Sequence, residues 1–276
     1  MAGRIKLIAI DLDGTMVNDA KDLPQANLDA IDEAGRVGIT VAVATGRTVT
    51  TVPPELLDRP CLRYVISANG SVITDIKENK VLYSNLIPHE TGLKVLEAGG
   101  RFRCVREFAA NGVLFCTADE EDYECSFVSP ELKGFMQAMH RTVPSLMEHF
   151  HTLNCDCEKL LIFSDLPEAL QDLKRYCEEE FGLTVSDSLA ENIEITAPGV
   201  SKARGLETLA GLLSIPLSET MAIGDSGNDL DMLKAAGFSV AMGNADERVK
   251  AAADTITLPN NEAGVAAAIR KYALGQ

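Results

Sequence analysis

The chain has 276 residues, 46% of them hydrophobic, which is enough for two domains with separate apolar cores. Asp and Glu number 41 against 25 Lys and Arg, so the formal net charge is −16 at pH 7. This charge argues against nucleic acid or an anionic membrane as the main partner. It leaves room for a small anionic substrate, because a metal ion and local cations can reverse the field inside one pocket.

The first apolar stretch, residues 7–10, is too short for the apolar region of a signal peptide or for a membrane span. We therefore expect a cytoplasmic location. Seven cysteines are an odd number in a chain too long to need a disulfide scaffold. Cys155 and Cys157, close behind His149 and His151, invite a metal-site interpretation, but the spacing is not C-x-x-C and no second pair follows, so buried thiols are favoured.

Strands and helices alternate in the first part of the chain. In chain order we predict a strand over 4–10, a helix over 27–35, a strand over 40–44, a short helix within 53–60, a strand over 64–67 and a hairpin over 71–83. Strand–helix–strand repeats of this kind predict an open parallel sheet with right-handed crossovers.

The pattern changes in the middle of the chain, where helices and strands no longer alternate regularly. We predict strands over 104–108, 113–116 and 159–163, and helices over 88–98, 130–139 and 167–181. This region is interpreted as an inserted α+β domain.

The alternating pattern then returns. We predict strands over 193–196, 221–224 and 238–242, and helices over 202–213, 229–236, 246–253 and 261–272. The predicted fold is therefore an α/β, Rossmann-like core formed by residues 1–84 and 190–276, with a cap domain over residues 85–189.

Three of the predicted core strands end in polar clusters, at residues 11–15, 45–47 and 224–229, and Ser201-Lys202 opens a helix. Ligands bind at the carboxyl ends of the strands in such sheets. Four carboxylates would meet there: Asp11, Asp13, Asp225 and Asp229. Their mutual repulsion predicts a hard divalent cation with oxygen ligands, best met by Mg²⁺. Lys202 and Thr45 would then offset the charge of a bound phosphate.

Asp11, at the end of its strand, is placed to attack phosphorus and form an aspartyl-phosphate. Asp13 follows two residues later and leans to the same side in extended backbone. It would protonate the leaving oxygen and then activate water. Gly14 allows the sharp turn that follows, and backbone N–H groups near Gly46 would position the phosphate.

These four elements, in this order, resemble the motifs of the haloacid dehalogenase (HAD) superfamily, D-x-D-G-T, a strand-terminal Thr, a Lys at a helix start and G-D-x-x-N-D. Further segments resemble its Cof-type sugar-phosphatase branch, among them residues 67–70, 193–196, 199–202 and 242–245. The resemblance implies a type-B α/β cap. It implies that the phosphoryl group is held by Thr45, Gly46, Lys202 and Asn228. It also implies that Mg²⁺ is held by Asp11, the backbone carbonyl of Asp13, Asp225 and Asp229, the last directly or through water.

Several residues stay open. Arg47 is interpreted as structural, paired with an acidic residue near a helix start. Asn69 either faces the pocket or only forms its turn. In the cap, five polar residues are candidates to touch the leaving group, although each alone is an ordinary surface residue: Arg103, Arg106, Glu107, His151 and Asn154.

The predicted function is a Mg²⁺-dependent phosphatase, a phosphoric monoester hydrolase, acting on a small phosphorylated metabolite. A phosphomutase that moves phosphate within one sugar would use the same motifs. A non-enzymatic phospho-accepting receiver domain and an inactive binding module are further alternatives, which the inserted cap and the intact acid pair disfavour. Dehalogenation fits poorly because it needs no metal.

Overall fold

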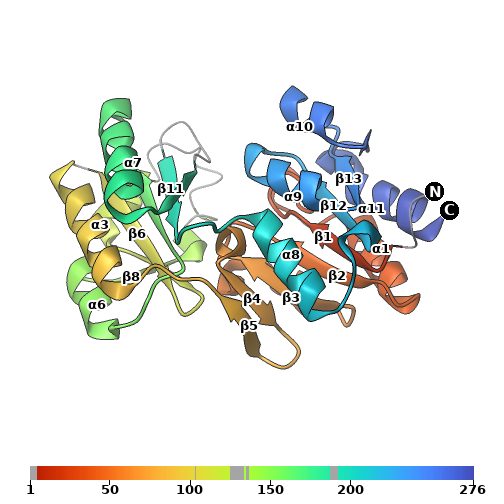
Figure 1. Cartoon of the computed structure of the whole chain (residues 1–276), viewed down its shortest axis with the longest axis horizontal. Coiled ribbons are helices and arrows are strands. Elements are labelled where there is room, and N and C mark those ends of the chain that lie inside the picture. Colours follow the sequence, from red (N-terminus) through yellow and green to blue (C-terminus); the bar gives the residue numbers. More distant parts are fainter. Residues whose placement is uncertain (1–4, 103, 125–133, 135–136, 187–191) are drawn as a thin grey trace. The chain divides into compact units, whose positions relative to one another are not determined.

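The structure is a computed structural model that describes residues 5–102, 104–124, 134, 137–186 and 192–276. The chain divides into two compact units. The first comprises Met1–Arg47, Val52–Ser84 and Ser201–Gln276, and the second comprises Thr48–Thr51 and Asn85–Val200. Figure 1 shows the elements of each unit along the chain.

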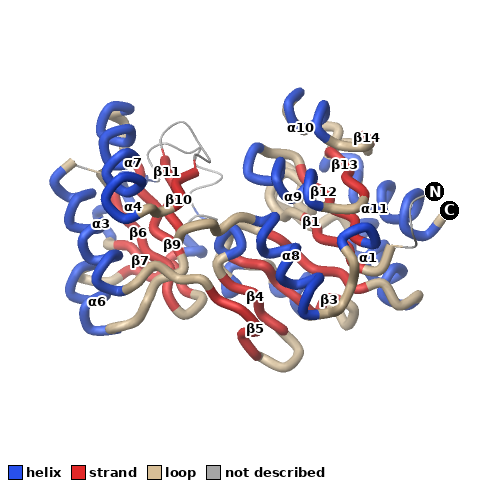
Figure 2. Tube along the Cα trace, viewed as in Figure 1, coloured by secondary structure: helices blue, strands red, loops and turns tan. Residues whose placement is uncertain are grey.

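An eight-stranded sheet forms the centre of the first unit, in the order β14-β13-β12-β1-β2-β3-β4-β5. Its strands are β1 (Leu7–Ile10), β2 (Thr40–Ala44), β3 (Leu62–Ser67), β4 (Val72–Asp75), β5 (Lys80–Ser84), β12 (Thr220–Gly224), β13 (Phe238–Ala241) and β14 (Thr255–Ile256). The strands from β14 to β3 are parallel, while β4 and β5 extend the sheet as an antiparallel hairpin, drawn in red in Figure 2.

The central strands are largely apolar, and β1 is apolar along its whole length. β1 is buried at every position, and Leu7 is paired with Thr220 of β12 on one side and Thr40 of β2 on the other. Continuous apolar runs are typical of parallel strands covered on both faces. The sequence therefore places β1 in the middle of the sheet.

Helices lie between these strands along the chain or follow the last strand. They are α1 (Gln25–Arg36), α2 (Pro54–Leu57), α8 (Lys202–Leu212), α9 (Leu230–Ala235), α10 (Glu247–Ala252) and α11 (Gly264–Ala268), followed by a π-helical segment, Ile269–Leu274. In α1, Leu28 and Ile31 lie on the buried face, as the helical spacing predicts.

The second unit has a six-stranded sheet in the order β10-β11-β9-β6-β7-β8, in which only β7 and β8 are parallel neighbours among the described strands. The strands are β6 (Val105–Ala110), β7 (Val113–Cys116), β8 (His140–Thr142), β9 (Lys159–Phe163), β10 (Thr184–Ser186) and β11 (Asn192–Thr196). Its described helices are α3 (His89–Arg101), α4 (Ala118–Glu124), α6 (Leu146–Leu153) and α7 (Pro167–Phe181).

The two faces of this second sheet differ. Helices α3, α6 and α7 pack on one face around a large apolar cluster that includes Leu96, Phe108, Phe150 and Leu173 (Figure 1). The other face carries a smaller apolar cluster of Val105, Ala109, Leu114, Leu161 and Phe163. Strand alternation separates the two sets, since successive side chains point to opposite faces.

The predicted α/β class is confirmed, and most elements form where they were predicted. The strand over 193–196 forms, but its assignment to the core sheet is wrong. It is part of β11, which pairs with β9 and β10 in the second unit. Ile193 and Ile195 point into the large apolar cluster of that unit, which holds the strand there.

The helix predicted over 261–272 is also wrong in detail. Ala263 has a left-handed φ of +54°, which interrupts the helix, so a 3₁₀ turn (Asn260–Glu262), α11 and the π-helical segment replace one continuous helix. Most of the helix predicted over 130–139, the predicted boundary at residue 190 and Arg103 lie outside the described residues. Within the described parts of the chain, we find no helix with the length and apolar character needed to cross a membrane.

Candidate active site

Three polar clusters meet because three parallel strands are neighbours. β12, β1 and β2 lie side by side, and Asp225, Asp11 and Thr45 directly follow them. The carboxyl ends of parallel strands share one edge of the sheet, so these residues come together there. The convergence predicted from the sequence is found.

Lys202 is the centre of the polar contacts. Its Nζ lies 2.5 Å from Asp11 Oδ1, 2.7 Å from Asp229 Oδ1 and 3.1 Å from Asn228 Oδ1. The lysine is only 2% exposed. Burial by itself lowers the pKa of a lysine, but the charges of Asp11 and Asp229 outweigh it and raise the pKa of Lys202 above its usual value. The two carboxylates therefore favour the protonated, cationic form of Lys202.

Helix α8 fixes the position of this cation. Lys202 is its first residue, and the Ser201 side chain caps the helix by accepting a hydrogen bond from the Arg204 N–H at 3.1 Å. The turn at Gly70 packs directly against this helix start: a Cβ on Gly70 would collide with the Ser201 carbonyl oxygen. The approach of two backbones explains why glycine occupies a position with φ +105°.

The three carboxylates form a compact group. Asp11, Asp225 and Asp229 each offer one oxygen, and these atoms all lie within 4.8 Å of one another. Burial raises the pKa of Asp11 well above its usual value, and the charges of Asp229 and Asp225 raise it further, although Lys202 opposes them. Burial and the charge of Asp229 raise the pKa of Asp225 to about 6, against a hydrogen bond from Thr15. Crowded carboxylate oxygens with raised pKa values fit a hard divalent cation.

Asp229 is engaged on both oxygens. Oδ1 contacts Lys202, while Oδ2 accepts hydrogen bonds from the Asp225 N–H at 3.0 Å and the Ser226 N–H at 3.1 Å. The side chain has no solvent exposure. Asp229 therefore shapes the turn after β12 as well as adding negative charge.

Asp13 is held by Arg47. Arg47 Nε lies 2.8 Å from Asp13 Oδ2 and Arg47 Nη2 lies 2.7 Å from Asp13 Oδ1, a two-pronged contact, and Lys21 Nζ approaches within 3.4 Å. Burial would raise the pKa of Asp13, but the hydrogen bond and charge of Arg47 outweigh it, so the pKa of Asp13 is lowered. The interpretation of Arg47 as a partner for an acid near a helix start is wrong: its partner is the predicted acid–base residue.

The loop after β2 carries the predicted phosphate-binding residues Thr45 and Gly46. Thr45 is buried, and its hydroxyl accepts a hydrogen bond from the Arg47 N–H at 3.1 Å, while Gly46 is half-buried. The Asn69 N–H donates to the Thr45 carbonyl oxygen at 3.0 Å, with φ +57° at Asn69. Asn69 thus forms a left-handed turn that supports the neighbouring loop.

Two contacts were missed by sequence reasoning. Thr15 Oγ1 donates to Asp225 Oδ1 at 2.5 Å, and Asn244 Nδ2 donates to the Gly14 carbonyl oxygen at 2.8 Å. Both residues lie in segments that the sequence singled out, at the end of D-x-D-G-T and in Met-Gly-Asn-Ala. Their places in these motifs marked Thr15 and Asn244 as candidates. The motifs could not identify their hydrogen-bond partners, which lie more than 200 residues away in the chain.

Of the five candidates for contact with the leaving group, four lie among the described residues of the second unit: Arg106, Glu107, His151 and Asn154. Arg106 pairs with Glu120, with Nε 2.9 Å from Oε1, and Asn154 ends α6 in a left-handed conformation. His151 lies in the last turn of α6. Glu107 differs from the surface residue that was expected, because it is fully buried.

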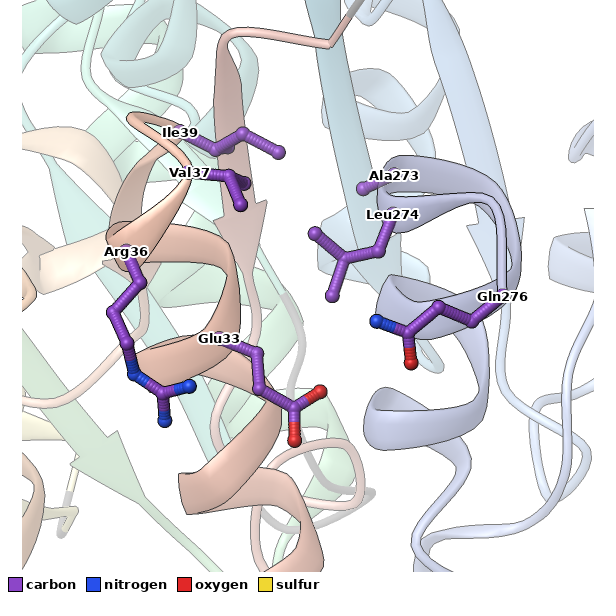
Figure 3. A pocket seen from close by; sticks show the side chains of 7 residues that line it. All are labelled: Glu33, Arg36, Val37, Ile39, Ala273, Leu274 and Gln276. Atoms are coloured by element: carbon purple, nitrogen blue, oxygen red, sulfur yellow. The ribbon is translucent and has the colours of Figure 1, made fainter.

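A pocket of about 370 Å³ lies elsewhere in the first unit (Figure 3). Its lining includes Glu33 of α1, Ile39 and Gln276. Ile39 precedes β2 while Thr45 follows it, so the pocket is at the opposite end of that strand from the carboxylates. Glu33 is paired there with Arg270 at 2.9 Å. This pocket takes no part in the site.

A family model for haloacid dehalogenase-like hydrolases matches residues 8–269. The chain belongs to this family. The phosphatase YwpJ of Bacillus subtilis (strain 168) is 36% identical over 280 residues, covering 95% of this chain and 98% of that protein. The 5-amino-6-(5-phospho-D-ribitylamino)uracil phosphatase YcsE of the same strain is 32% identical over 274 residues, covering 98% of this chain and 96% of that protein.

Solved structures agree with this HAD assignment. A haloacid dehalogenase-like hydrolase from B. subtilis is 33% identical, with a TM-score of 0.84 over 97% of this chain and 100% of that one. Similar structures also include a HAD subclass IIB sugar phosphatase. The predicted family is confirmed, and the relatives support a phosphoric monoester hydrolase.

Proposed function

We propose that this HAD-type phosphatase uses Mg²⁺ and an aspartyl-phosphate at Asp11 to hydrolyse a small phosphorylated metabolite. The observation that carries the proposal is the position of Lys202, which contacts Asp11 and Asp229 within a compact carboxylate group. The Lys202 ammonium group and the oxygen atoms of Asp225 and Asp229, which could bind a metal ion, thus lie next to the candidate nucleophile Asp11. This combination suits the transfer of a charged phosphoryl group.

The residues present fit Mg²⁺. Asp11 and Asp225 would hold it through carboxylate oxygens and Asp13 through its backbone carbonyl. Because both oxygens of Asp229 already accept hydrogen bonds, this side chain would act through water. When bound, Mg²⁺ would neutralise phosphate charge and help to align the phosphoryl group with Asp11.

Asp11 would attack the phosphorus atom, forming a bond from its carboxylate oxygen as the bond to the leaving oxygen breaks. Lys202 binds Asp11 Oδ1 and fixes the orientation of the carboxylate. Asp13 would give a proton to the leaving oxygen. It would then take a proton from the water that attacks the aspartyl-phosphate, releasing inorganic phosphate and restoring Asp11.

Arg47 gives Asp13 a defined starting state. The two-pronged contact favours the ionised carboxylate, which is the form that accepts a proton from water. To act first as the acid, Asp13 must take up a proton from solvent as the substrate binds, releasing part of its contact with Arg47, and then give that proton to the leaving oxygen. Arg47 is therefore proposed as a positioning residue.

The phosphoryl oxygens would be held by Lys202, Asn228, Thr45 and backbone N–H groups around Gly46. Lys202 and Asn228 are already in contact at 3.1 Å. We propose that the first compact unit is the catalytic core and the second its type-B cap, with the boundary after Val200 in place of the predicted residue 190, and with Thr48–Thr51 grouped with the cap. The ribitylaminouracil phosphate named for one relative and the sugar phosphatase among the structures favour a phosphorylated sugar or sugar alcohol.

The test is phosphate release from a panel of sugar, sugar-alcohol and nucleotide phosphates, with Mg²⁺ and with chelator. We expect release that requires Mg²⁺ and is lost in Asp11→Asn. Asp231→Asn is the matched control, because Asp231 is an exposed aspartate of α9 that only pairs with Lys234. Equal rates for wild type and Asp11→Asn would contradict the proposed nucleophile. Conversion of a hexose phosphate to an isomer without phosphate release would instead support a mutase.

A further inference from the structure

A second group of metal-type donors lies within the second compact unit. Glu107 is on β6, Cys116 on β7 and His140 on β8, three consecutive neighbours in the sheet. Phe108 pairs with Phe115 and Leu114 with His140, so strand alternation puts all three donors on one face. This is the face of the smaller apolar cluster, opposite the face on which α3, α6 and α7 pack.

The three side chains are buried and close. Glu107 and Cys116 have no solvent exposure, and the His140 side chain is 1% exposed. One donor atom from each lies within 4.8 Å of the other two, and His140 Nε2 is 3.2 Å from Glu107 Oε1. Tetrahedral zinc with ligands at about 2.0–2.3 Å places neighbouring ligand atoms roughly 3.3–3.8 Å apart. The observed group needs only small side-chain shifts to reach that spacing.

A further carboxylate lies beside the imidazole. Glu121, on α4, has its Oε1 3.6 Å from His140 Nδ1, and α4 packs against β6. The ring thus has Glu107 on its Nε2 side and Glu121 on its Nδ1 side. Metal-bound histidines are commonly oriented by a carboxylate on the nitrogen that does not bind the metal.

We propose that Glu107, Cys116 and His140 bind a Zn²⁺ ion in the second unit, with Glu121 orienting His140 and water as the fourth ligand. A thiolate, an imidazole and a carboxylate together suit a borderline-soft ion such as zinc, whereas Mg²⁺ prefers oxygen alone. On binding, the Cys116 thiol releases its proton to solvent and His140 binds as the neutral imidazole. The carboxylate of Glu107 and the thiolate of Cys116 balance the two positive charges of the ion, and the Glu121 carboxylate beside His140 adds one negative charge.

The competing explanation is a buried ion pair between protonated His140 and Glu107. Such a pair needs no thiol, and desolvation offsets much of its attraction. Zinc would use all three donors and would join β6, β7 and the three-residue strand β8. It would therefore stabilise this side of the sheet, and its effects would not require catalytic activity.

The test uses the full-length protein, stripped with chelator and then titrated with Zn²⁺ or Co²⁺. We expect about one Zn²⁺ retained per chain after dialysis, a higher melting temperature with Zn²⁺, and a thiolate-to-Co²⁺ charge-transfer absorption in the near ultraviolet. Cys116→Ser should abolish that absorption. Cys155→Ser should keep it, because Cys155 is a half-buried thiol of the same unit that receives a hydrogen bond from Asn111.

Glu107→Gln keeps the size of the side chain and can still form a hydrogen bond with His140. It is therefore the second test of the site if Cys116→Ser does not fold. We expect it to weaken Zn²⁺ binding at least tenfold. Asp225→Asn should leave Zn²⁺ binding and the Co²⁺–thiolate absorption unchanged, which separates this site from the proposed Mg²⁺ site. Absence of a Co²⁺–thiolate absorption in wild type, or an unchanged absorption in Cys116→Ser, would overturn the proposal.

Discussion

Lys202 is the residue on which the charge balance of the site depends. It is buried between Asp11 and Asp229, and each of these carboxylates lies within 2.7 Å of its ammonium group. Removing one partner from a buried charge network leaves the others uncompensated, at a cost of about 3–5 kcal/mol. The same cation would meet the phosphate, so stability and activity are linked at this position.

We therefore expect Lys202→Met to reduce phosphate release by roughly 10²–10³-fold. Its free energy of unfolding should also fall as pH rises from 5 to 8. Without the lysine, the raised pKa values of Asp11 and Asp225 rise further, and a raised carboxyl pKa means that stability present at low pH is lost as pH increases. Urea unfolding at several pH values measures this. Lys234→Met, at an exposed lysine of α9, is the control and should behave as wild type.

Arg47 provides a second prediction, because it lowers the pKa of Asp13. In Arg47→Gln that pKa should rise, so ionised Asp13 disappears at a higher pH as the solution is acidified. The acid limb of the pH profile of kcat, at saturating Mg²⁺, should shift to higher pH, and Arg47→Lys should shift it less. An unmoved acid limb in Arg47→Gln would show that Asp13 is not the group under its control.

Residue-level prediction from sequence succeeded where a side chain directly follows a strand or begins a helix. Asp11 and Lys202 could be placed together because strand ends and helix starts have defined positions in an open α/β sheet. The partner of Arg47 could not be found in this way. A long side chain reaches several candidate acids, and its choice depends on the path of the loop after β2.

At the scale of elements, the start of α8 is set by its packing against the Gly70 turn. Gly70→Ala adds a Cβ that collides with the Ser201 carbonyl oxygen at a position with φ +105°. We expect a loss of about 1–3 kcal/mol in unfolding free energy and a fall in kcat, since Lys202 shifts with the helix start.

Gly211→Ala is the matched control for this substitution. Gly211 lies in the same helix, and an added Cβ meets nothing within 4 Å. Alanine there should be neutral or stabilise by up to about 1 kcal/mol, with kcat unchanged. Equal behaviour of the two variants in urea unfolding and kinetics would refute the role given to the Gly70 contact.

Strand β11 was predicted correctly as a strand but assigned to the wrong sheet. Its sequence, Asn-Ile-Glu-Ile-Thr, alternates apolar and polar residues, which predicts a strand but not the sheet that it joins. Sheet membership was decided by Ile193 and Ile195, which complete the apolar cluster of the second unit. The interruption of the C-terminal helix at Ala263 could not be predicted from the sequence either, because alanine rarely adopts the left-handed conformation found there.

At the scale of the whole molecule, the chain has a net charge of −16, and three of its carboxylates, those of Asp11, Asp225 and Asp229, lie together beside Lys202. A cation that binds this group in the folded state alone stabilises the protein, by about 2.7 kcal/mol at a concentration one hundred times its Kd. We expect Mg²⁺ to raise the melting temperature of wild type and of Asp231→Asn, and to have little effect on Asp225→Asn.

This stabilisation should weaken as pH falls below about 6. The pKa of Asp225 is raised to about 6 in the absence of metal, so protons then compete with Mg²⁺ for the carboxylate. Melting curves with and without Mg²⁺ between pH 5 and 8 measure the effect. A Mg²⁺-dependent shift of equal size at every pH would argue against Asp225 as a ligand.

The central claim is that Asp11 carries the phosphoryl group during turnover. Acid-quenched enzyme, mixed with Mg²⁺ and a turned-over phosphate ester, can be treated with borohydride, which reduces an aspartyl-phosphate to homoserine. Peptide mass spectrometry should then find homoserine at position 11, dependent on substrate. Turnover with unmodified Asp11, or with the phosphate carried by another residue, would contradict the account.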